Sequence, residues 1–313
     1  MRILFAGSPG IAVPSLEALA ESRHEVVGVL TNPDAVRGRG RNACVTHVKE
    51  IGVDLGYPII QPRKLDAEVR EEVAALKPDI LVAVAYGRIF GPKFLDLFPL
   101  GGLNLHPSLL PKYRGCSPVN AAILHGDSKS GVTIQRLAHE MDSGEILKQE
   151  IYPLKGNEKA DKLLDIFSEI GARLLIETLD EIESGTIEGH AQDEADVSFC
   201  TFIKKEDGLI PWVSSAVEID RMARAYCPWP GIYTTFKGQK LNIADVSVYT
   251  GDLTFNNSEP GKVLGIDKNE GILIQTGDGI LAALSLQLQA RKAMDFKSFL
   301  NGNKDFTGSL LGG

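Results

Sequence analysis

Short apolar runs alternate with helical stretches from Ile3 to Ile182, and this alternation limits the fold more than any other feature of the sequence. Ile3–Ala6 and Val26–Leu30 are predicted strands, and Ile11–Leu19 between them has the apolar periodicity of a helix. Strands that alternate with helices in this way build a mostly parallel α/β sheet. The pattern continues with predicted strands over Ile80–Ala85, Leu103–Leu105, Val132–Leu137 and Ile146–Ile151, and helices over Val69–Leu76, Val119–Leu124 and Asp161–Ile182.

The pattern changes after Gly185. Residues 185–208 lack periodicity and are rich in charged and small polar side chains, which is typical of a linker. From Leu209 onward a helical stretch over Ser215–Ala225 precedes short β-rich runs, which indicate a small antiparallel barrel. These runs are Tyr233–Phe236, Leu241–Tyr249, Gly261–Leu264, Gly271–Gln275 and Ile280–Leu288.

Length and charge agree with two domains. At about 150 residues per domain, 313 residues suit an α/β domain over 1–184, a linker over 185–208 and a barrel domain over 209–313. Charged residues at 24% and apolar residues at 43% exclude wholesale disorder. The net charge of −8 argues against a general nucleic-acid coat or a membrane-surface binder. Residues 1–208 hold 23 basic and 31 acidic side chains and residues 209–313 hold ten of each, so a local basic patch stays compatible with the total.

Several motif classes are absent from the sequence. The cysteines at positions 44, 116, 200 and 227 form no CxxC pair, so we expect no zinc knuckle, no thioredoxin-type site and no bound metal. The first strand-to-helix turn, Gly7-Ser-Pro-Gly10, lacks the GxGxxG fingerprint, which argues against a nicotinamide-dependent dehydrogenase. Single cysteines without a secretory or membrane-spanning segment predict a cytoplasmic protein that does not contact a membrane.

Three polar residues follow predicted strands, where α/β enzymes keep their chemistry. Asn104 and His106 flank Leu105 at the end of one strand, and strand alternation puts both on one face. Asp142 lies in the loop after the next strand, so the amide, imidazole and carboxylate are expected to converge. Taken singly, the residues have simpler interpretations, because Asn-X-His is more often a hydrogen-bonding filler and an Asp before Ser-Gly is usually a turn residue.

The three side chains would have different chemical roles. Asn104 offers an uncharged N–H donor to a developing oxyanion. His106 can accept a proton, donate one or stabilise charge. Asp142 would orient the imidazole and favour its charged form, or help to remove protons from an attacking amine. No GxSxG elbow surrounds Ser108, so the set fits direct acyl transfer between two bound substrates rather than a covalent acyl-enzyme.

A long two-part motif makes the sequence recognisable. Asn104-Leu-His106-Pro-Ser108-Leu-Leu-Pro111-Lys-Tyr-Arg-Gly115, followed by Met141-Asp142-Ser-Gly144, resembles the signature of the 10-formyltetrahydrofolate-dependent formyltransferases. Within them the chain resembles the methionyl-tRNA formyltransferase family almost end to end. The further matching segments are Thr31-Asn-Pro-Asp34, Arg37-Gly-Arg39-Gly40, Val84-Ala-Tyr86-Gly87, Gly131-Val-Thr-Ile134, Pro228-Trp229-Pro230 and Thr276-Gly-Asp-Gly-Ile-Leu281.

The resemblance implies a Rossmann-like formyltransferase domain, a linker and an OB-like β-barrel domain that binds tRNA. It implies formyl transfer from 10-formyltetrahydrofolate to the α-amine of methionyl initiator tRNA, for translation initiation, by a monomeric enzyme. The family's catalytic residues match Asn104, His106 and Asp142. The implied folate-binding residues are Ser108, Leu109, Leu110, Pro111, Tyr86, Gly87, Arg88, Ile89 and Met141. For Leu109 and Leu110, simple core packing is an equally good interpretation.

The segment Asn32–Lys49 has a local excess of positive charge. It contains Arg37, Arg39, Arg41 and Lys49 against the single acid Asp34, and the intervening glycines predict a supple loop. Such a loop can follow a phosphate backbone, although charge alone more often marks a solvated surface loop. The resemblance implies that Arg37, Arg39 and Arg41 contact the tRNA acceptor end. Trp229, between two prolines, is expected at a domain-packing corner rather than stacked on a base.

Three alternatives share parts of this pattern. A formyltransferase acting on a sugar-nucleotide amine and a formyl-folate hydrolase would have the same Asn, His and Asp, but the basic loop and the barrel speak against both. A catalytically silent RNA-binding module would not need the intact trio. The sequence also departs from the resembled pattern, with His106-Pro-Ser108 in place of the usual His-Gly-Ser.

Overall fold

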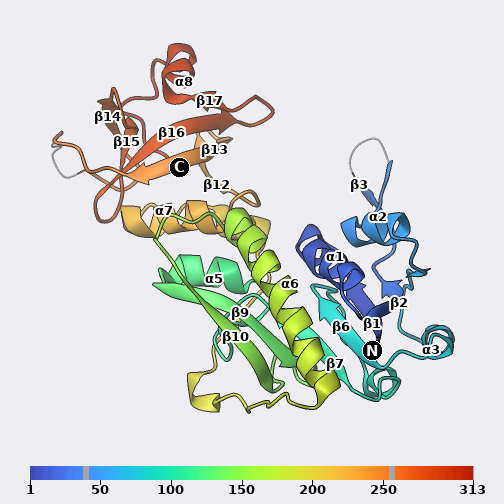
Figure 1. The fold of residues 1–313 in the computed structure, drawn as a ribbon. Coiled ribbons are helices and arrows are strands. Elements are labelled where there is room, and N and C mark those ends of the chain that lie inside the picture. The colour runs from blue at the N-terminus through green and yellow to red at the C-terminus, as the bar shows by residue number, and fades with distance from the viewer. Residues whose placement is uncertain (38–41, 254–257, 313) are drawn as a thin grey trace. The chain divides into compact units, whose positions relative to one another are not determined.

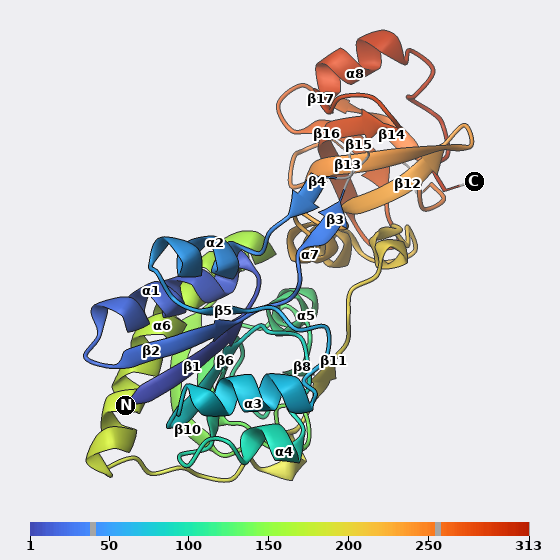
Figure 2. The same cartoon turned by 90° about the vertical axis from the view of Figure 1, so that its right-hand side faces the viewer.

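The computed structural model describes residues 1–37, 42–253 and 258–312 and divides the chain into two compact units (Figures 1 and 2). Unit 1 comprises Met1–Pro118, Lys129–Pro153 and Lys162–Thr201, and unit 2 comprises Val119–Ser128, Leu154–Asp161 and Phe202–Gly313. Unit 2 therefore includes two short segments from within the first predicted domain, and the predicted boundaries at 184 and 208 stay predictions.

Unit 1 is built on a seven-stranded, mostly parallel sheet, which confirms the predicted α/β fold. Its strand order is β10-β9-β7-β6-β1-β2-β5, with β9 antiparallel to β7 and to β10 and the other pairings parallel. Because the central strands are covered on both faces, their side chains form continuous apolar runs. The strands are β1 (Arg2–Gly7), β2 (Glu25–Leu30), β5 (Ile59–Ile60), β6 (Ile80–Val84), β7 (Gly102–His106), β9 (Lys129–Arg136) and β10 (Ile146–Pro153).

Helices cover both faces of this sheet (Figures 1 and 2). On one face, Leu4 of β1 and Leu81 of β6 are buried with Val73 of α3 and Phe94 of α4. On the other face, Gly171 of α6 lies against Leu105 of β7. The helices of unit 1 are α1 (Val13–Glu21), α2 (His47–Asp54), α3 (Ala67–Ala75), α4 (Pro92–Leu95) and most of α6 (Ala160–Ser184).

The described part of the basic segment Asn32–Lys49 contains regular secondary structure, whereas the sequence predicts a flexible loop. Strands β3 (Ala35–Arg37) and β4 (Asn42–Cys44) pair as an antiparallel hairpin, and α2 begins at His47. The Thr46 side chain accepts a hydrogen bond from the backbone N–H of Lys49 at 3.1 Å, which caps this helix. In the described part of Asn32–Lys49, the expected loop is therefore corrected to two paired strands followed by a helix, while Gly38 and Gly40 lie outside the described residues.

Unit 2 contains the predicted antiparallel β domain. Its sheet has the order β12-β13-β16-β15-β14, and β17 pairs with β16. A full capping box at Ser215 and Glu218 starts α7, and the Asn120 amide of α5 donates to the carbonyl of Ala225 at the other end of α7. The elements are α5 (Pro118–His125), α7 (Ala216–Ala225), β12 (Ile232–Phe236), β13 (Gln239–Val248), β14 (Val263–Asp267), β15 (Gly271–Gln275), β16 (Ile280–Leu288), β17 (Met294–Asp295) and α8 (Phe296–Gly302).

The close contact between α6 and β7 requires glycine at position 171, because glycine has no Cβ. A Cβ at Gly171 would lie 2.3 Å from Cδ1 of Leu105, well inside van der Waals contact. We expect Gly171→Ala to push α6 from the sheet and to lower the free energy of unfolding by about 1–3 kcal/mol, the usual cost of overpacking. Urea denaturation measures this change.

The matched control is Gly302→Ala in α8, because a Cβ there meets no atom within 4 Å. This control is expected to leave stability unchanged or to raise it by up to about 1 kcal/mol through helix propensity. Equal stability of Gly171→Ala and the wild type would contradict the close packing of α6 on β7.

Candidate active site

The structure brings the three predicted catalytic side chains together at the end of β7. Asn104 and His106 project from alternate positions of this strand, and Asp142 lies in the turn between β9 and β10. Asn104 Nδ2 donates to Asp142 Oδ1 at 3.3 Å, and His106 Nδ1 lies 3.6 Å from the same oxygen. The convergence expected from strand alternation is therefore present, while the catalytic roles stay predictions.

The Asp142 carboxylate is surrounded by N–H donors from separate elements. Besides Asn104, Gln135 of β9 donates from Nε2 to Oδ1 at 2.9 Å. The backbone N–H of Gly115 donates to Oδ2 at 2.8 Å. Since the Asp142 side chain is only 13% exposed, these donors replace the water that an ionised carboxylate would otherwise need.

His106 is buried and held at both ring nitrogens. Its Nε2 lies 2.9 Å from the backbone oxygen of Tyr113, and its Nδ1 faces Asp142. The Tyr113 carbonyl can only accept, so Nε2 carries a proton, and a second proton on Nδ1 would face a carboxylate oxygen. The imidazole is thus held between the Tyr113 carbonyl and the Asp142 carboxylate, beside the Asn104 amide.

Two glycines allow backbone segments around Asp142 to pack closely against neighbouring backbone. Gly115 (φ +122°) belongs to β8 (Arg114–Gly115), which pairs with β11 (Phe199–Cys200), and a Cβ there would lie 2.1 Å from the oxygen of Cys200. A Cβ at Gly144 would lie 1.8 Å from the oxygen of Arg136. Any other residue at either position would displace the backbone that presents an N–H to Asp142 or the turn that carries it.

Sequence reasoning missed two residues of this site. Gln135 is 1% exposed in β9, and an uncharged polar side chain inside a predicted strand was the available signal. Gln192 donates to the backbone oxygen of Asp142 at 2.8 Å and accepts from Arg114 Nε at 2.9 Å. Gln192 lies in the segment predicted as a linker, where no periodic pattern marks it.

The Ser108–Pro111 segment is anchored on the β9–β10 hairpin. Ser108 is fully buried, with its hydroxyl donating to the oxygen of Lys112 at 2.6 Å and its carbonyl accepting from Thr133 Oγ1 at 2.7 Å. The Leu110 oxygen accepts from Gln149 Nε2 at 2.7 Å. The Ser108 hydroxyl and the backbone carbonyls of Ser108 and Leu110 therefore hold the segment in place, and a ligand would meet the half-buried Leu109 and Pro111.

The predicted folate segment after β6 exposes backbone and apolar side chains. Tyr86 is 3% exposed and stacks on Phe90, and its hydroxyl has no hydrogen-bond partner among the described residues. Gly87 has φ +78°, while Ile89 and Met141 are exposed apolar side chains. Leu137, which directly follows β9, packs against the cluster that contains Tyr86, so the loop that carries Met141 starts beside the segment after β6.

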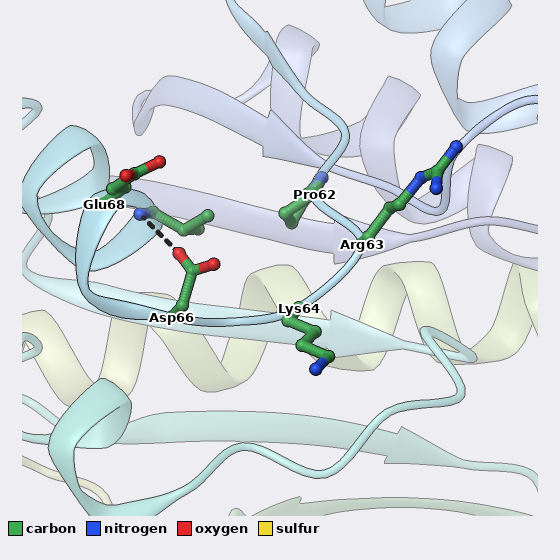
Figure 3. Close-up of a pocket in the computed structure, with 6 residues that line it drawn as sticks. Pro62, Arg63, Lys64, Asp66 and Glu68 are labelled. Atoms are coloured by element: carbon green, nitrogen blue, oxygen red, sulfur yellow. Dashed lines mark hydrogen bonds between the residues drawn. The ribbon is translucent and has the colours of Figure 1, made fainter.

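A pocket of about 300 Å³ lies beside this segment, between β5 and α3 (Figure 3). Arg63 and Lys64 line it, and Arg88 donates from Nη1 to the oxygen of Pro62 at 2.9 Å. Asp66, also in the lining, caps α3 by accepting from the backbone N–H of Val69, as the dashed line in Figure 3 shows. Two cations, Arg63 and Lys64, and two acids, Asp66 and Glu68, thus line the pocket next to the predicted folate segment.

The base of the basic hairpin is held by an acid. Asp34 accepts from Lys49 Nζ at 2.6 Å and from Gln61 Nε2 at 2.8 Å. These hydrogen bonds, that from Gln61 first, lower the pKa of Asp34. Arg37 is the last residue of β3, whereas Arg39 and Arg41 lie outside the described residues. Lys49 thus pairs within the fold.

Unit 2 has a cationic and aromatic cluster of its own. Lys240 Nζ lies 3.6 Å from the centre of the Tyr233 ring. Burial and then the nearby charge of Lys205 lower the pKa of Lys240. Trp229, which the sequence places between two prolines, is 58% exposed. Lys205, Lys240 and Tyr233 thus form a cationic and aromatic cluster, a combination that suits phosphates and bases.

Two thiols lie near the candidate carboxylate. Cys116 is exposed, and burial followed by the charge of Asp142 raises the pKa of its thiol. Cys200 is half-buried, and its Sγ accepts from the backbone N–H of Ser117 at 3.3 Å. Burial is also the main cause that raises the pKa of Cys200. Both thiols are therefore weak nucleophiles near neutral pH.

Comparisons with known proteins cover both halves of the chain. Residues 1–179 match the family described as formyl transferase, and residues 202–304 match the formyl transferase C-terminal domain. The methionyl-tRNA formyltransferase of Treponema denticola is 46% identical over 317 residues, which covers 98% of each chain. That of Roseiflexus castenholzii is 42% identical and covers 100% of this chain and 99% of its own.

Solved structures share the fold at lower identity. An N-formyltransferase from Helicobacter canadensis, solved with folinic acid and dTDP-3-aminofucose, has a TM-score of 0.67 at 22% identity and covers 90% of this chain and 98% of its own. HypX from Aquifex aeolicus has a TM-score of 0.66 at 19% identity. The match covers 99% of this chain, which spans about half of HypX, at 49%. None of the helices in the described part of the chain combines the length and hydropathy needed to cross a bilayer.

The thiol of Cys116 reports on the charge of Asp142. Asp142→Asn removes a negative charge that disfavours the thiolate, so we expect the pKa of Cys116 to fall. Alkylation by iodoacetamide at pH 8 should then become about two- to fivefold faster, because only the thiolate reacts. Peptide mass spectrometry measures the rate at Cys116, with the exposed Cys44 as an internal reference. Equal rates at Cys116 in both proteins would show that Asp142 does not act on this thiol.

Proposed function

The chain belongs to the formyl transferase family, and we propose that it transfers a formyl group from 10-formyltetrahydrofolate to the α-amine of methionyl initiator tRNA, for translation initiation. The observation that carries the proposal is the meeting of Asn104, His106 and Asp142 at the end of β7. Relatives that are 42–46% identical over nearly the whole chain are named for this substrate. We further propose a monomeric, cytoplasmic enzyme.

The three side chains suit the charges of formyl transfer to an amine. The formyl donor supplies the electrophilic carbon. As the amine adds, the formyl oxygen gains negative charge and the nitrogen must lose a proton. Asn104 would donate N–H to that oxygen, and the positive charge of His106 would stabilise it. Asp142 would orient the imidazole and accept the amine proton, directly or through water.

The residues after β6 and β9 fit a folate. Ile89 and Met141 are exposed apolar side chains suited to a flat ring, and the buried Tyr86 hydroxyl is without a partner among the described residues. Exposed backbone at Gly87 would meet the polar edge of the pterin. Ser108 and Leu110 would act by fixing the backbone of their segment, on which Leu109 and Pro111 face the ligand.

The pocket lined by Arg63 and Lys64 is the proposed site for the other end of the folate. The glutamate tail of a folate carries carboxylates, and Arg63 and Lys64 line a pocket next to the 86–89 segment. Arg88 is tied to the same pocket through the carbonyl of Pro62. We assign the tail to this pocket because guanidinium groups pair well with carboxylates. The pterin and tail would then lie on opposite sides of Arg88.

The tRNA would meet cations in both units. Arg37, Arg39 and Arg41 belong to the basic segment Asn32–Lys49, and the lysines near Tyr233 provide a surface in unit 2. These groups are local, which agrees with a net charge of −8 for the whole chain. A sugar-nucleotide amine as acceptor would use the same trio but would need neither surface. Assays with charged initiator tRNA, charged elongator tRNA and a free amine separate these acceptors.

Loss of either donor should slow the chemical step. We expect Asn104→Ala and His106→Ala each to lower kcat by at least about 10²-fold, the scale for one oxyanion donor. Transfer of labelled formyl groups to charged initiator tRNA measures the rate, and circular dichroism checks that each variant folds. A folded variant at either position with near wild-type turnover would refute the assignment.

The two substrate regions should separate in kinetics. Arg63→Ala is expected to raise KM for the formyl donor about tenfold, since a paired charge is lost, and to leave KM for tRNA unchanged. Arg39→Ala is expected to raise KM for tRNA and to leave KM for the formyl donor unchanged. It should also reduce the slope of log affinity for tRNA against log salt concentration by about one. Each variant is thus the other's control. Equal effects of both variants on both substrates would contradict the separate sites.

A further inference from the structure

A side chain from a distant part of the sequence holds the turn that carries Asp142. Gln192 donates from Nε2 to the backbone oxygens of Asp142 and Gly144, both at 2.8 Å. Asp142 has φ +54°, in the left-handed region that residues other than glycine seldom adopt. Because one amide nitrogen binds a carbonyl on each side of Ser143, the course of the turn and the direction of the Asp142 side chain are both restrained.

Arg114 determines which way the Gln192 amide faces. Arg114 Nε donates to Gln192 Oε1 at 2.9 Å, and a guanidinium group has donors only. The amide oxygen must therefore face Arg114, which leaves Nε2 for the turn. Arg114 is 4% exposed, and its Nη2 pairs with Glu194 Oε1 at 2.9 Å. This second partner fixes the planar guanidinium group on its other side.

The same network reaches the Asp142 carboxylate. Gln192 Nε2 lies 3.5 Å from Gln135 Oε1, and Gln135 Nε2 donates to Asp142 Oδ1 at 2.9 Å. The turn backbone and the carboxylate are thus held by two adjoining amides. Gln192 is 9% exposed and Gln135 is 1% exposed, so little water competes for these hydrogen bonds.

We propose that Gln192 and Arg114 are positioning residues that keep the Asp142 carboxylate directed at His106 during formyl transfer, an inference that rests on the proposed function. Gln192 hydrogen-bonds to the backbone of the turn, and Arg114 hydrogen-bonds to Gln192. A misplacement of about 1 Å in a catalytic group can cost about 10²-fold in rate. The segment predicted as a linker would therefore contribute directly to the geometry of the site.

Two substitutions separate positioning from packing. Gln192→Glu keeps the size of the side chain and gives Arg114 a better partner, but it places a carboxylate oxygen against two carbonyl oxygens. Gln192→Ala removes the amide altogether. For both variants we expect kcat to fall about 10- to 100-fold and KM for the formyl donor and for tRNA to stay within about twofold. A kcat within twofold of wild type in both variants overturns the proposal.

Gln275 provides a matched control in unit 2. It is also 9% exposed, and its Nε2 donates to two turn carbonyls, those of Thr276 and Gly279. Gln275→Ala should lower the thermal midpoint as much as Gln192→Ala but leave kcat unchanged. If the two alanine variants lose stability and activity in the same proportion, Gln192 is merely structural and the proposal fails.

Crystal structures give a readout that does not depend on activity. In Gln192→Glu we expect Asp142 to leave the left-handed region or its carboxylate to move away from His106. An Asp142 unchanged in conformation and distance overturns the positioning role. Absence of formyl transfer to charged initiator tRNA by the wild-type chain would instead refute the proposed function, and the structural comparison would still decide the role of Gln192.

Discussion

A carboxylate taken out of water needs N–H donors around it, and this requirement organises the site. Asp142 obtains them from β7, from the backbone of β8 and from β9, through Asn104, Gly115 and Gln135. These donors can converge only if β8 pairs with β11 and if no side chain intervenes at the glycine. The short β8–β11 ladder, which adds little apolar core, is thus explained by the charge that it helps to satisfy.

The parts of the structure that the sequence predicts are those with a local periodic signal. Strands β1 and β6 are continuous apolar runs, and alternation within β7 was enough to place Asn104 and His106 on one face. The three-residue strands of the hairpin are too short to show a period, and α2 is marked only by its Thr46 cap. Gln192 was beyond prediction, because its partners are 48 and 78 residues away in the sequence, at Gly144 and Arg114.

The net charge of the chain is a poor guide to the ligands that it can bind. The total of −8 counts acids that neutralise lysines and arginines within the fold, as Asp34 does for Lys49. The cations proposed to bind substrates lie in small local groups. They are Arg63 and Lys64, Lys205 and Lys240, and the arginines of the basic segment Asn32–Lys49. Where a charge lies and what already pairs with it decide what it can bind, and both depend on tertiary structure.

The way the chain is divided between its two units has a consequence for dissection. The backbone passes from one unit to the other five times, because Val119–Ser128 and Leu154–Asp161 belong with the C-terminal residues. A fragment starting at Phe202 would lack α5, and with it the Asn120 amide that satisfies the carbonyl of Ala225 at the end of α7. Such a fragment would leave this carbonyl without its partner, although the match to the formyl transferase C-terminal domain is continuous over residues 202–304.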